Sequence, residues 1–454
     1  MITRKACGLA VVLLTGQLWA NDFENARLDN WHQWRGPNAN GIAPNGNPPL
    51  HWDESTNIKW KVEIPGKGSA TPIVWKDRIF VLTAIDMGVE PADQLRTAAQ
   101  PPTDGRSERS GGFRHRMTRD VSTIHEFVIL CLDKETGGAR WKQIANREVP
   151  HEGGHLTNTH ASASPLTDGK NLYASFGSRG IFCYSLDGDL IWKRDLGDMQ
   201  TRRGFGEGTS PVLHGEHLIV TWDHEGDSFI TCLDAGTGAD RWKVARDEVT
   251  TWATPLIVKH GDVTQVVTNG TIRSRAYNLE NGEQIWECGG QATNPIASPV
   301  VHDGLVFCMT GHRGYALNAI PLDATGDITD SDNIAWTRTR GTSYIASPLL
   351  QDGLLYFTKS RNGILSCVKA RTGEEVYIEK RLPGISTIYA SLASAAGKIF
   401  IVGRDGTTVV VKQGPDFEVL ARNQLDEGID ASPVIVGDDL FLRSSGHLYC
   451  ISAE

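Results

Sequence analysis

Several features that would place this chain in a common class of proteins are missing from the sequence. It has no Cys-x-x-Cys pair and no cysteine and histidine spacing of the zinc type, so we expect no metal site. Lysine and arginine number 45 against 54 aspartates and glutamates, and this acidic balance argues against nonspecific binding to nucleic acid. The apolar run from Ala6 to Leu14 is too short for a stable membrane anchor, and we expect no membrane span. What is plentiful, 48 glycines and 13 tryptophans, suits a β-rich globular protein with many turns.

Residues 1–20 have the three parts of a secretory signal peptide. Arg4 and Lys5 precede the apolar run, and Leu18-Trp19-Ala20 resembles a cleavage site. Cys7 lies before the run, which argues against a lipid-anchoring cysteine. We therefore predict export to the periplasm or the cell exterior, with a buried N-terminal helix as the alternative. Removal of the segment would change the net charge from −9 to −11.

A module of four short strands recurs along the chain. All but one of the copies open on a Ser/Thr-Pro pair, and from Pro165 onward the openings are spaced by 46, 44, 44, 49, 44 and 41 residues. This spacing is typical of the blades of a β-propeller. The larger gap of 93 residues between Pro72 and Pro165 fits one blade with an insertion. The openings, which imply eight blades, are Thr71-Pro72, Ser164-Pro165, Ser210-Pro211, Thr254-Pro255, Ser298-Pro299, Ser347-Pro348, Ser391-Leu392 and Ser432-Pro433.

Most fourth strands carry a tryptophan, and the last module lacks this strand. The aromatic positions are Trp141, Trp192, Trp242, Trp286 and Trp336, with Tyr377 and Leu420 as weaker copies. Trp60 stands 12 residues before Pro72, just as Trp336 stands 12 before Pro348. We therefore predict an all-β, eight-bladed propeller of four-stranded antiparallel blades over 57–454, whose last blade is closed by the N-terminal strand. Closure of this kind leaves no unpaired sheet edge.

Seven cysteines follow the predicted signal peptide, and three of them share one position. Cys131, Cys232 and Cys367 each stand six residues before the glycine of the third turn. Matching positions in adjacent blades lie roughly 10 Å apart, beyond the ~7 Å Cα limit for a disulfide. Small buried core residues are therefore the favoured interpretation, with disulfide bridges as the alternative.

Two segments fall outside the repeats. Residues 21–56 form an irregular lead-in with Trp31 and Trp34, which we expect to anchor on the ring or, alternatively, to form an aromatic platform for a ligand. The insertion at 85–124 lies between the second and third strands of the first blade and carries five arginines between Arg106 and Arg119. Long loops of such composition are disordered or functional. A disordered basic flap is the favoured interpretation.

The two faces of the predicted propeller differ. Turns after first and third strands are mostly tight, as at Asp168-Gly169 and Asn281-Gly282, whereas the opposite face carries charged and aromatic loops. Function on rigid scaffolds concentrates in such loops. The candidate ligand-binding residues there are Arg179, Arg203, Glu207, His224, Glu225, Asp227, Trp252, Arg273, Arg313, Tyr344, Arg361 and Arg404.

Arginines dominate that face. Six of the seven blades without the insertion have one between the second and third strands, Arg443 completing the series. Repeated cations in an acidic chain suit an anionic ligand; alternatively each arginine pairs with a nearby carboxylate, as Arg404 could with Asp405. His151, His155 and His160 match no metal motif, and Glu152, Glu207, Glu225 and Asp227 would serve as bases only if desolvated.

These motifs resemble the pyrroloquinoline-quinone-like propeller repeat family. The resemblance rests on the Ser/Thr-Pro openings, the recurrent tryptophan and the Cys-Leu-Asp-x-x-Thr-Gly turns at 131–137 and 232–238, and the stretches 31–37 and 203–208 are similar to secreted bacterial members of unassigned role. The family comprises quinoprotein dehydrogenases and non-enzymatic propellers such as the lipoprotein of the outer-membrane β-barrel assembly machinery. The adjacent Cys-Cys pair of the dehydrogenases is absent here.

The resemblance and the charged face together predict an exported, non-catalytic propeller. Its partner would be a protein, an anionic small molecule or a saccharide, bound on the charged loops without a cofactor. The alternative is a dehydrogenase of alcohols or sugars that depends on pyrroloquinoline quinone and calcium, with the quinone over the central funnel.

The insertion gives the first testable prediction. Its composition offers little apolar surface to offset the entropy lost on ordering. Limited proteolysis should therefore cut first between Ile85 and Ile124 and leave the remaining ring folded, as gel electrophoresis and mass measurement would show. First cleavage elsewhere, with this segment protected, would instead indicate that it packs on the ring.

Overall fold

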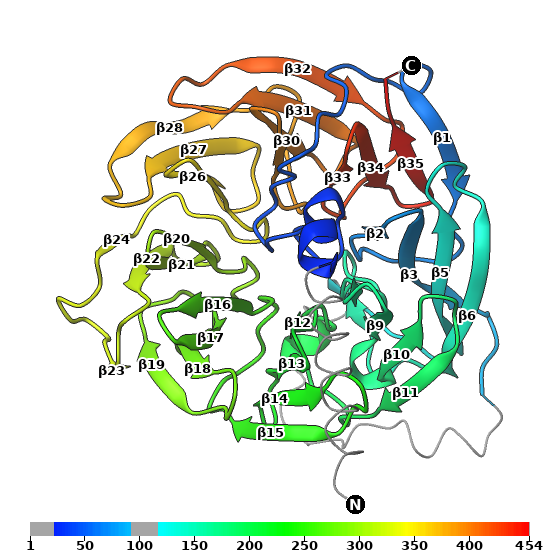
Figure 1. Cartoon of the computed structure of the whole chain (residues 1–454), viewed down its shortest axis with the longest axis horizontal. Helices are drawn as coiled ribbons and strands as arrows, with labels where there is room; N and C mark the ends of the chain where they lie inside the picture. The colour runs from blue at the N-terminus through cyan, green and yellow to red at the C-terminus, as the bar shows by residue number, and fades with distance from the viewer. Residues whose placement is uncertain (1–21, 92–116, 454) are drawn as a thin grey trace, which may run out of the picture.

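The computed structural model describes residues 22–91 and 117–453, so the predicted signal peptide and most of the predicted insertion lie outside the described residues. Eight antiparallel sheets surround a central axis (Figure 1). In each blade the first strand is innermost and the fourth lies at the rim. The predicted all-β, eight-bladed propeller is confirmed.

Seven blades use their strands in chain order, and the last takes its fourth strand from the N-terminal segment; the first strand of each blade lies at the axis. The first four blades contain β2 (Ile73–Trp75), β3 (Arg78–Asp86), β5 (His125–Asp133) and β6 (Ala139–Glu148); β8 (Leu166–Thr167), β9 (Asn171–Ser175), β10 (Ile181–Ser185) and β11 (Leu190–Arg194); β12 (Val212–His214), β13 (His217–Trp222), β14 (Phe229–Asp234) and β15 (Asp240–Ala245); and β16 (Leu256–His260), β17 (Val263–Thr268), β18 (Ser274–Asn278) and β19 (Gln284–Cys288).

The second half of the ring repeats the pattern. Its blades contain β20 (Val300–His302), β21 (Leu305–Thr310), β22 (Ala316–Pro321) and β24 (Trp336–Arg338); β25 (Leu349–Gln351), β26 (Leu354–Thr358), β27 (Ile364–Lys369) and β28 (Glu375–Arg381); β29 (Ala393–Ala395), β30 (Lys398–Val402), β31 (Thr407–Lys412) and β32 (Val419–Gln424); and β33 (Val434–Val436), β34 (Asp439–Arg443), β35 (His447–Ile451) and β1 (Ile58–Glu63).

A few short elements lie outside the four-strand pattern. Residues 22–26 are helical. β23 leaves the fifth blade and adds a parallel strand to β19, and β4 pairs with β7 as a separate two-stranded sheet. Their bounds, with those of the 3-10 helices, are η1 (Arg27–Asp29), η3 (Gly177–Arg179), η4 (Arg202–Gly204), β4 (Thr118–Arg119), β7 (Gly154–His155) and β23 (Gly326–Asp327).

The N-terminal strand closes the ring. β1 pairs antiparallel with β35, with Trp60 opposite Cys450, and Figure 1 shows the blue strand beside the red ones. The indole N–H of Trp60 donates to the Lys134 carbonyl of the first blade at 3.0 Å. Trp60 therefore occupies the blade-ending position that the sequence predicted, and the closure is confirmed.

A row of three side chains crosses most blades and accounts for five of the seven cysteines, all except Cys288 and Cys308. In the first blade Phe80 of β3, Cys131 of β5 and Trp141 of β6 are register partners. The phenyl and indole ring centroids lie 5.9 Å apart across the sheet, and the cysteine is the small residue between them. All seven cysteines of the described chain are buried and free, as expected for core residues. Burial raises the pKa of the Cys131 thiol to about 12, so the thiol stays protonated.

The same tryptophans join neighbouring blades. Their indole N–H groups donate at 2.8–3.0 Å to a carbonyl in the next blade's turn between its third and fourth strands. The glycine of that turn has positive φ and lies against the ring, where a Cβ would come within 2.6–3.1 Å of an indole carbon. A larger residue would push the indole out, so tryptophan and glycine are required together. The pairs are Trp60–Gly137, Trp141–Gly188, Trp192–Gly238, Trp242–Gly282 and Trp336–Gly373.

The Ser/Thr-Pro openings form a hydrogen-bonded ring around the axis. The backbone N–H of one opening residue donates to the hydroxyl of the next, for example from Ser164 to Ser210 at 2.9 Å. Seven such bonds join the eight openings. The eighth bond, from the Thr254 N–H to the Ser298 hydroxyl, is missing, and the Ser298 hydroxyl has no partner among the described residues. We call this the interrupted step of the ring.

The lead-in packs on the ring at the tight-turn face, where the turns after first and third strands lie. Trp31 bridges to Val74 of β2, and Ile42 bridges to Ser394 of β29. The Asn47 N–H donates to Gly437, in a turn after a first strand, at 2.9 Å. Trp31 is 1% exposed and Trp52 is 3% exposed, so both indoles are core residues, whereas Trp34 is half-buried. Trp31 is therefore not part of a ligand platform.

The closing strand offers a direct test. Trp60→Ala should lower the free energy of unfolding by about 2–4 kcal/mol, because it removes a packed indole and its inter-blade hydrogen bond. Lys59→Ala, on the outward side of the same strand, should change it by less than about 0.5 kcal/mol. Deletion of Asn57 to Glu63 should destabilise further. Chemical unfolding measures all three, and equal stability of the Trp60 variant and its parent would contradict the closure.

Candidate functional site

The loops opposite the tight turns meet over the axis and form a mouth. The Thr157 hydroxyl lies 3.4 Å from that of Tyr389, although their loops lead into the second and seventh blades. Arg202, before the third blade, donates to Asn294, before the fifth, at 3.2 Å. Blades that are not neighbours can touch only near the axis. We call this face the long-loop face and its centre the mouth.

Aromatic rings and arginines line the mouth. His155 packs edge-on against Phe205, with centroids 5.1 Å apart, and His312 stacks on Tyr344 at 4.5 Å. The Arg404 guanidinium lies over the Tyr389 ring, 4.1 Å from its centroid. Stacking of this kind holds flat polar groups in fixed orientations. The mouth is therefore a surface whose side chains are held in defined orientations.

Arginine side chains place positive charge around two histidines of the mouth. Burial lowers the pKa of His312, and the charges of Arg313, Arg202, Arg361 and Arg203 lower it further. Burial also lowers the pKa of His155, and the charges of Arg361 and Arg404 lower it further. Arg404 is neutralised by Asp430 through bonds of 2.5 and 2.8 Å. Within the described ranges, Arg313 and Arg361 form no ion pair and are exposed, which leaves two arginines available to an anion.

A small pocket opens beside the mouth, between the first three blades. It has a cavity volume of about 40 Å³ and is lined by Glu207, Glu152, His160, Ser178 and Arg179 among others. Glu207 accepts from the Ser178 N–H at 2.8 Å and from its hydroxyl at 2.5 Å. A Cβ on Gly177 would fall on the Glu207 carboxylate, so glycine is needed there. We call this the Glu207 pocket.

Burial sets the protonation of this pocket. It raises the pKa of Glu207 to about 7, aided by the charge of Glu152 and opposed by the Ser178 hydrogen bonds and Arg179. Burial also lowers the pKa of His160 to about 4, so its imidazole is neutral near pH 7. A carboxyl that titrates near neutrality in a pocket is chemically able to exchange protons.

The described end of the insertion borders both sites. β4 pairs with β7, placing Arg119 against Gly154 and Thr118 against His155. The Leu156 N–H donates to Met117 at 2.9 Å. A Cβ on Gly153 would meet the Arg119 carbonyl at 1.9 Å, so this close approach depends on glycine. The insertion therefore leads directly to the loop that carries His155.

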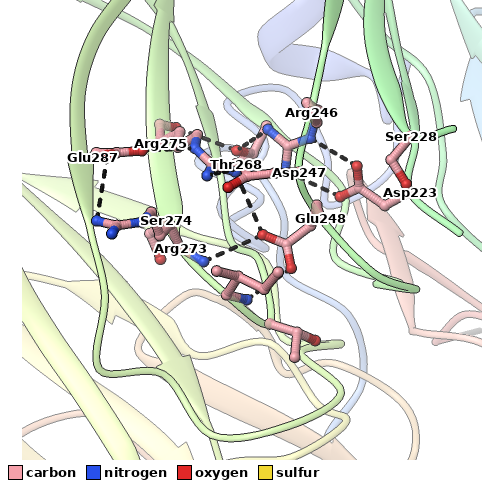
Figure 2. A network of polar contacts seen from close by, with 12 residues as sticks. Asp223, Ser228, Arg246, Asp247, Glu248, Thr268, Arg273, Ser274, Arg275 and Glu287 are labelled. Atoms are coloured by element: carbon pink, nitrogen blue, oxygen red, sulfur yellow. Dashed lines mark hydrogen bonds and ion pairs between the residues drawn. The ribbon is translucent and has the colours of Figure 1, made fainter. Parts of the chain in front are cut away.

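A buried ionic network supports the loops between the third and fourth blades (Figure 2). The Arg246 guanidinium donates to both Asp223 oxygens, at 2.7 and 3.0 Å, and to the Tyr277 hydroxyl at 2.6 Å. Thr251, one residue before Trp252, donates to Asp223 at 2.8 Å. Next to this pair, Arg275 contacts Asp247, Glu248 and Glu287. The network ties the loop before the fourth blade to the core.

The structure brings some of the predicted residues together and separates others. Arg203, Arg313, Tyr344, Arg361 and Arg404 gather at the mouth, and Trp252 lies at its edge, donating to the Gly206 carbonyl at 2.7 Å. Arg179 and Glu207 belong to the Glu207 pocket.

The remaining candidates have local partners or lie apart. His224 accepts from the Gln200 N–H at 3.1 Å, and Glu225 accepts from Thr250 at 2.8 Å. Asp227 is exposed. Arg273 pairs with Asp327 of β23 and Glu287 of β19 at the rim, 2.9 and 3.3 Å away, so it does not face the mouth.

Two sequence-based expectations are wrong, namely the partner of Arg404 and the position of Arg443. Arg404 pairs with Asp430 and not with Asp405, whose side chain accepts instead from the Thr407 N–H. Arg443 ends strand β34 and is fully buried, donating to the Ala70 carbonyl at 2.9 Å. It is therefore a core residue and not part of a charged loop. Both outcomes depend on contacts between distant segments, which residue spacing does not reveal.

Sequence reasoning missed three residues of the mouth, namely Tyr389, His312 and Asn294. Tyr389 had a usable signal, because it stands three residues before Leu392 just as Trp252 stands three before Pro255. His312 precedes Arg313 directly, but nothing in its neighbours predicts the stacking on Tyr344. Asn294 is recognisable only from its contact with Arg202.

Comparison with known families agrees with this fold. Residues 125–379, more than half of the chain, match the pyrroloquinoline-quinone-like propeller family described as outer membrane protein assembly factor BamB. The chain belongs to this family. The outer membrane protein assembly factor BamB of Bordetella pertussis is 28% identical over 291 residues, which are 61% of this chain and 68% of that protein.

Solved structures share the fold with little sequence identity. Quinohemoprotein alcohol dehydrogenase from Comamonas testosteroni superimposes with a TM-score of 0.60 and 10% identity, covering 95% of this chain and 82% of the dehydrogenase. The computationally designed Ika8 protein gives 0.50 and 11% identity, covering 74% of this chain and 93% of the design. At such identities the likeness shows the fold alone.

Titration of Glu207 can be tested through stability. Because its folded pKa of about 7 lies above the ordinary value of 4.5, its contribution is fully present below about pH 4.5 and is lost as the pH rises through 7. The stability of the protein relative to the Glu207→Gln variant should fall over this range by up to about 3 kcal/mol.

Chemical unfolding at stepped pH gives this difference directly. Asp227→Asn, which removes an exposed carboxylate on the same face, is the control for general pH effects. If the difference between the protein and the Glu207 variant stays constant between about pH 4.5 and 7, Glu207 does not titrate in this range and the raised pKa is wrong.

Proposed function

We propose that this chain is an exported, non-catalytic propeller that binds an acidic segment of a protein partner at the mouth of its long-loop face. The observation that carries the proposal is the pair of exposed arginines without ion-pair partners in the described chain, Arg313 and Arg361, beside fixed aromatic rings. Arginine presents a planar set of donors that suits carboxylates. Stacked rings next to such donors favour a flat or extended ligand.

Family membership supports a binding role. The family and the Bordetella pertussis relative are both described as assembly factors, a name that implies work on other proteins. The positive mouth within an acidic chain would attract acidic segments from a distance and orient them. An anionic small molecule or a saccharide acid would use the same arginines and would compete for them.

The sequence and the family both support the proposed export. Residues 1–20 have the form of a secretory signal, and the name of the relatives refers to the outer membrane. We therefore place the protein in the periplasm or outside the cell. In the part of the chain that the structure describes, no helix has the length and apolar character needed to span a bilayer.

One observation favours the alternative function, a quinone-dependent dehydrogenase. Glu207 has a pKa of about 7 and lies beside a pocket, as a general base would. The cofactor fits less well. Arg313 and Arg361 would suit the carboxylates of pyrroloquinoline quinone, but no three acidic, histidine or cysteine side chains of residues 22–91 and 117–453 gather as a cation site. Acidic side chains alone therefore do not form a calcium site in these residues.

Acidic-peptide binding tests the proposal. Fluorescein-labelled decaglutamate should bind the protein in fluorescence anisotropy, more weakly as salt is raised. The Arg313→Gln, Arg361→Gln double variant should bind about tenfold more weakly. The matched control is Arg371→Gln with Lys412→Gln, the same charge change next to tight turns. Equal weakening in both double variants, or no binding by the parent, would reject the mouth as the binding surface.

The dehydrogenase alternative has its own assay. Protein supplied with quinone and calcium should show no dye-linked oxidation of alcohols or sugars. Turnover that depends on the quinone and is lost in Glu207→Gln would establish the enzyme and overturn the non-catalytic assignment. Peptide binding and turnover are separate readouts, so the two functions can be distinguished.

A further inference from the structure

A buried arginine lies in the lead-in at the centre of the ring. Arg35 is 2% exposed and has a positive φ of 66°. Its Nη2 atom donates to the Asn40 carbonyl at 2.7 Å and to the Pro348 carbonyl at 2.6 Å. Its Nε and Nη1 atoms are also buried, yet neither has a hydrogen-bond partner among the described residues. Buried guanidinium donors normally have partners, so this pair requires an explanation.

Arg35 also lacks a counter-charge in the described part of the chain. Burial alone lowers its pKa, to about 9, and no carboxylate contributes to the shift. The guanidinium therefore still carries its charge at neutral pH. A desolvated positive charge without a negative partner is costly in a protein interior. An anion beside it would remove that cost.

A small cavity lies next to Arg35, and its lining includes a second residue with an unpartnered buried group. The cavity volume is about 20 Å³, and its lining includes Arg35, Thr254, Pro255, Ser298 and Pro299. The Ser298 hydroxyl is buried without a partner. This is the step at which the ring of opening hydrogen bonds is interrupted. A cavity of this size holds one atom or water molecule, so polyatomic anions are too large for it.

These observations point to one occupant. We propose that the cavity is a binding site for a single halide ion, chloride under physiological conditions, held by unpaired guanidinium N–H groups of Arg35 and by the Ser298 hydroxyl. The ion would neutralise Arg35 and fill the interrupted step between the fourth and fifth blades. The site is separate from the mouth, and its test does not depend on peptide binding.

Bromide provides a direct probe, because it replaces chloride and scatters X-rays anomalously. Crystals of the full chain soaked in sodium bromide should show an anomalous peak in the cavity between Arg35 and Ser298, at data collected on the bromine edge. The peak should disappear when an excess of chloride is added. Density at this position without an anomalous signal would mean a water molecule and would overturn the proposal.

Chloride-dependent stability is the second measurement. At constant ionic strength, kept with sodium gluconate, saturating chloride should raise the melting temperature by roughly 2–4 °C. Arg35→Gln should abolish this rise, and Ser298→Ala should shift half-saturation to several-fold higher chloride.

The control is Thr310→Val. It removes another buried, unpartnered hydroxyl that is absent from the cavity lining, and it should leave the chloride dependence unchanged. If Arg35→Gln does not fold, the Ser298 variant and the bromide peak still decide the question. A chloride response in Ser298→Ala identical to that of the parent, or no response in the parent, would contradict the site.

Discussion

The contact between a tryptophan on one blade and a glycine turn on the next is the interaction on which this ring depends. The indole caps the turn, its N–H satisfies a turn carbonyl, and the missing Cβ of the glycine lets the ring lie flat on the backbone. The contact occurs at five of the eight seams, where it sets the position of one sheet relative to its neighbour. Three seams vary the pattern. Between the fourth and fifth blades Trp286 donates to Gln265, whose amide donates to the Leu322 carbonyl, and the sixth and seventh blades end in Tyr377 and Leu420 in place of tryptophan.

The tryptophan contacts at the rim and the hydrogen bonds between opening residues at the axis hold the blades together. The loops of one face are therefore free to vary. The lead-in covers the tight-turn face through contacts such as that of Trp31 with Val74. The long-loop face instead brings arginines and rings from several blades to the axis, where Thr157 meets Tyr389. The buried pair of Asp223 and Arg246 holds the loop before Trp252 in place. A rigid ring with one adaptable face is suited to recognition.

The blades could be predicted from sequence because their determinants are local and periodic. Trp60 was identified as a closing residue from its spacing to Pro72 alone, and the cysteines were assigned to the core by their constant offset from a glycine. The partners of the arginines could not be predicted in this way. Arg273 pairs with Asp327, 54 positions away, and Arg35 donates to the Pro348 carbonyl, 313 positions away. No repeat encodes such pairings, so sequence located the charged face but not which arginines remain available on it.

The central claim is that the mouth of the long-loop face is the recognition surface. Hydrogen–deuterium exchange with and without bound decaglutamate tests it most directly, because exchange reports where the backbone becomes protected. The account predicts slower exchange around His155, Arg202 and Tyr389, and no change in the turns that hold Gly238 and Gly373. Protection of those turns with an unaffected mouth would contradict it.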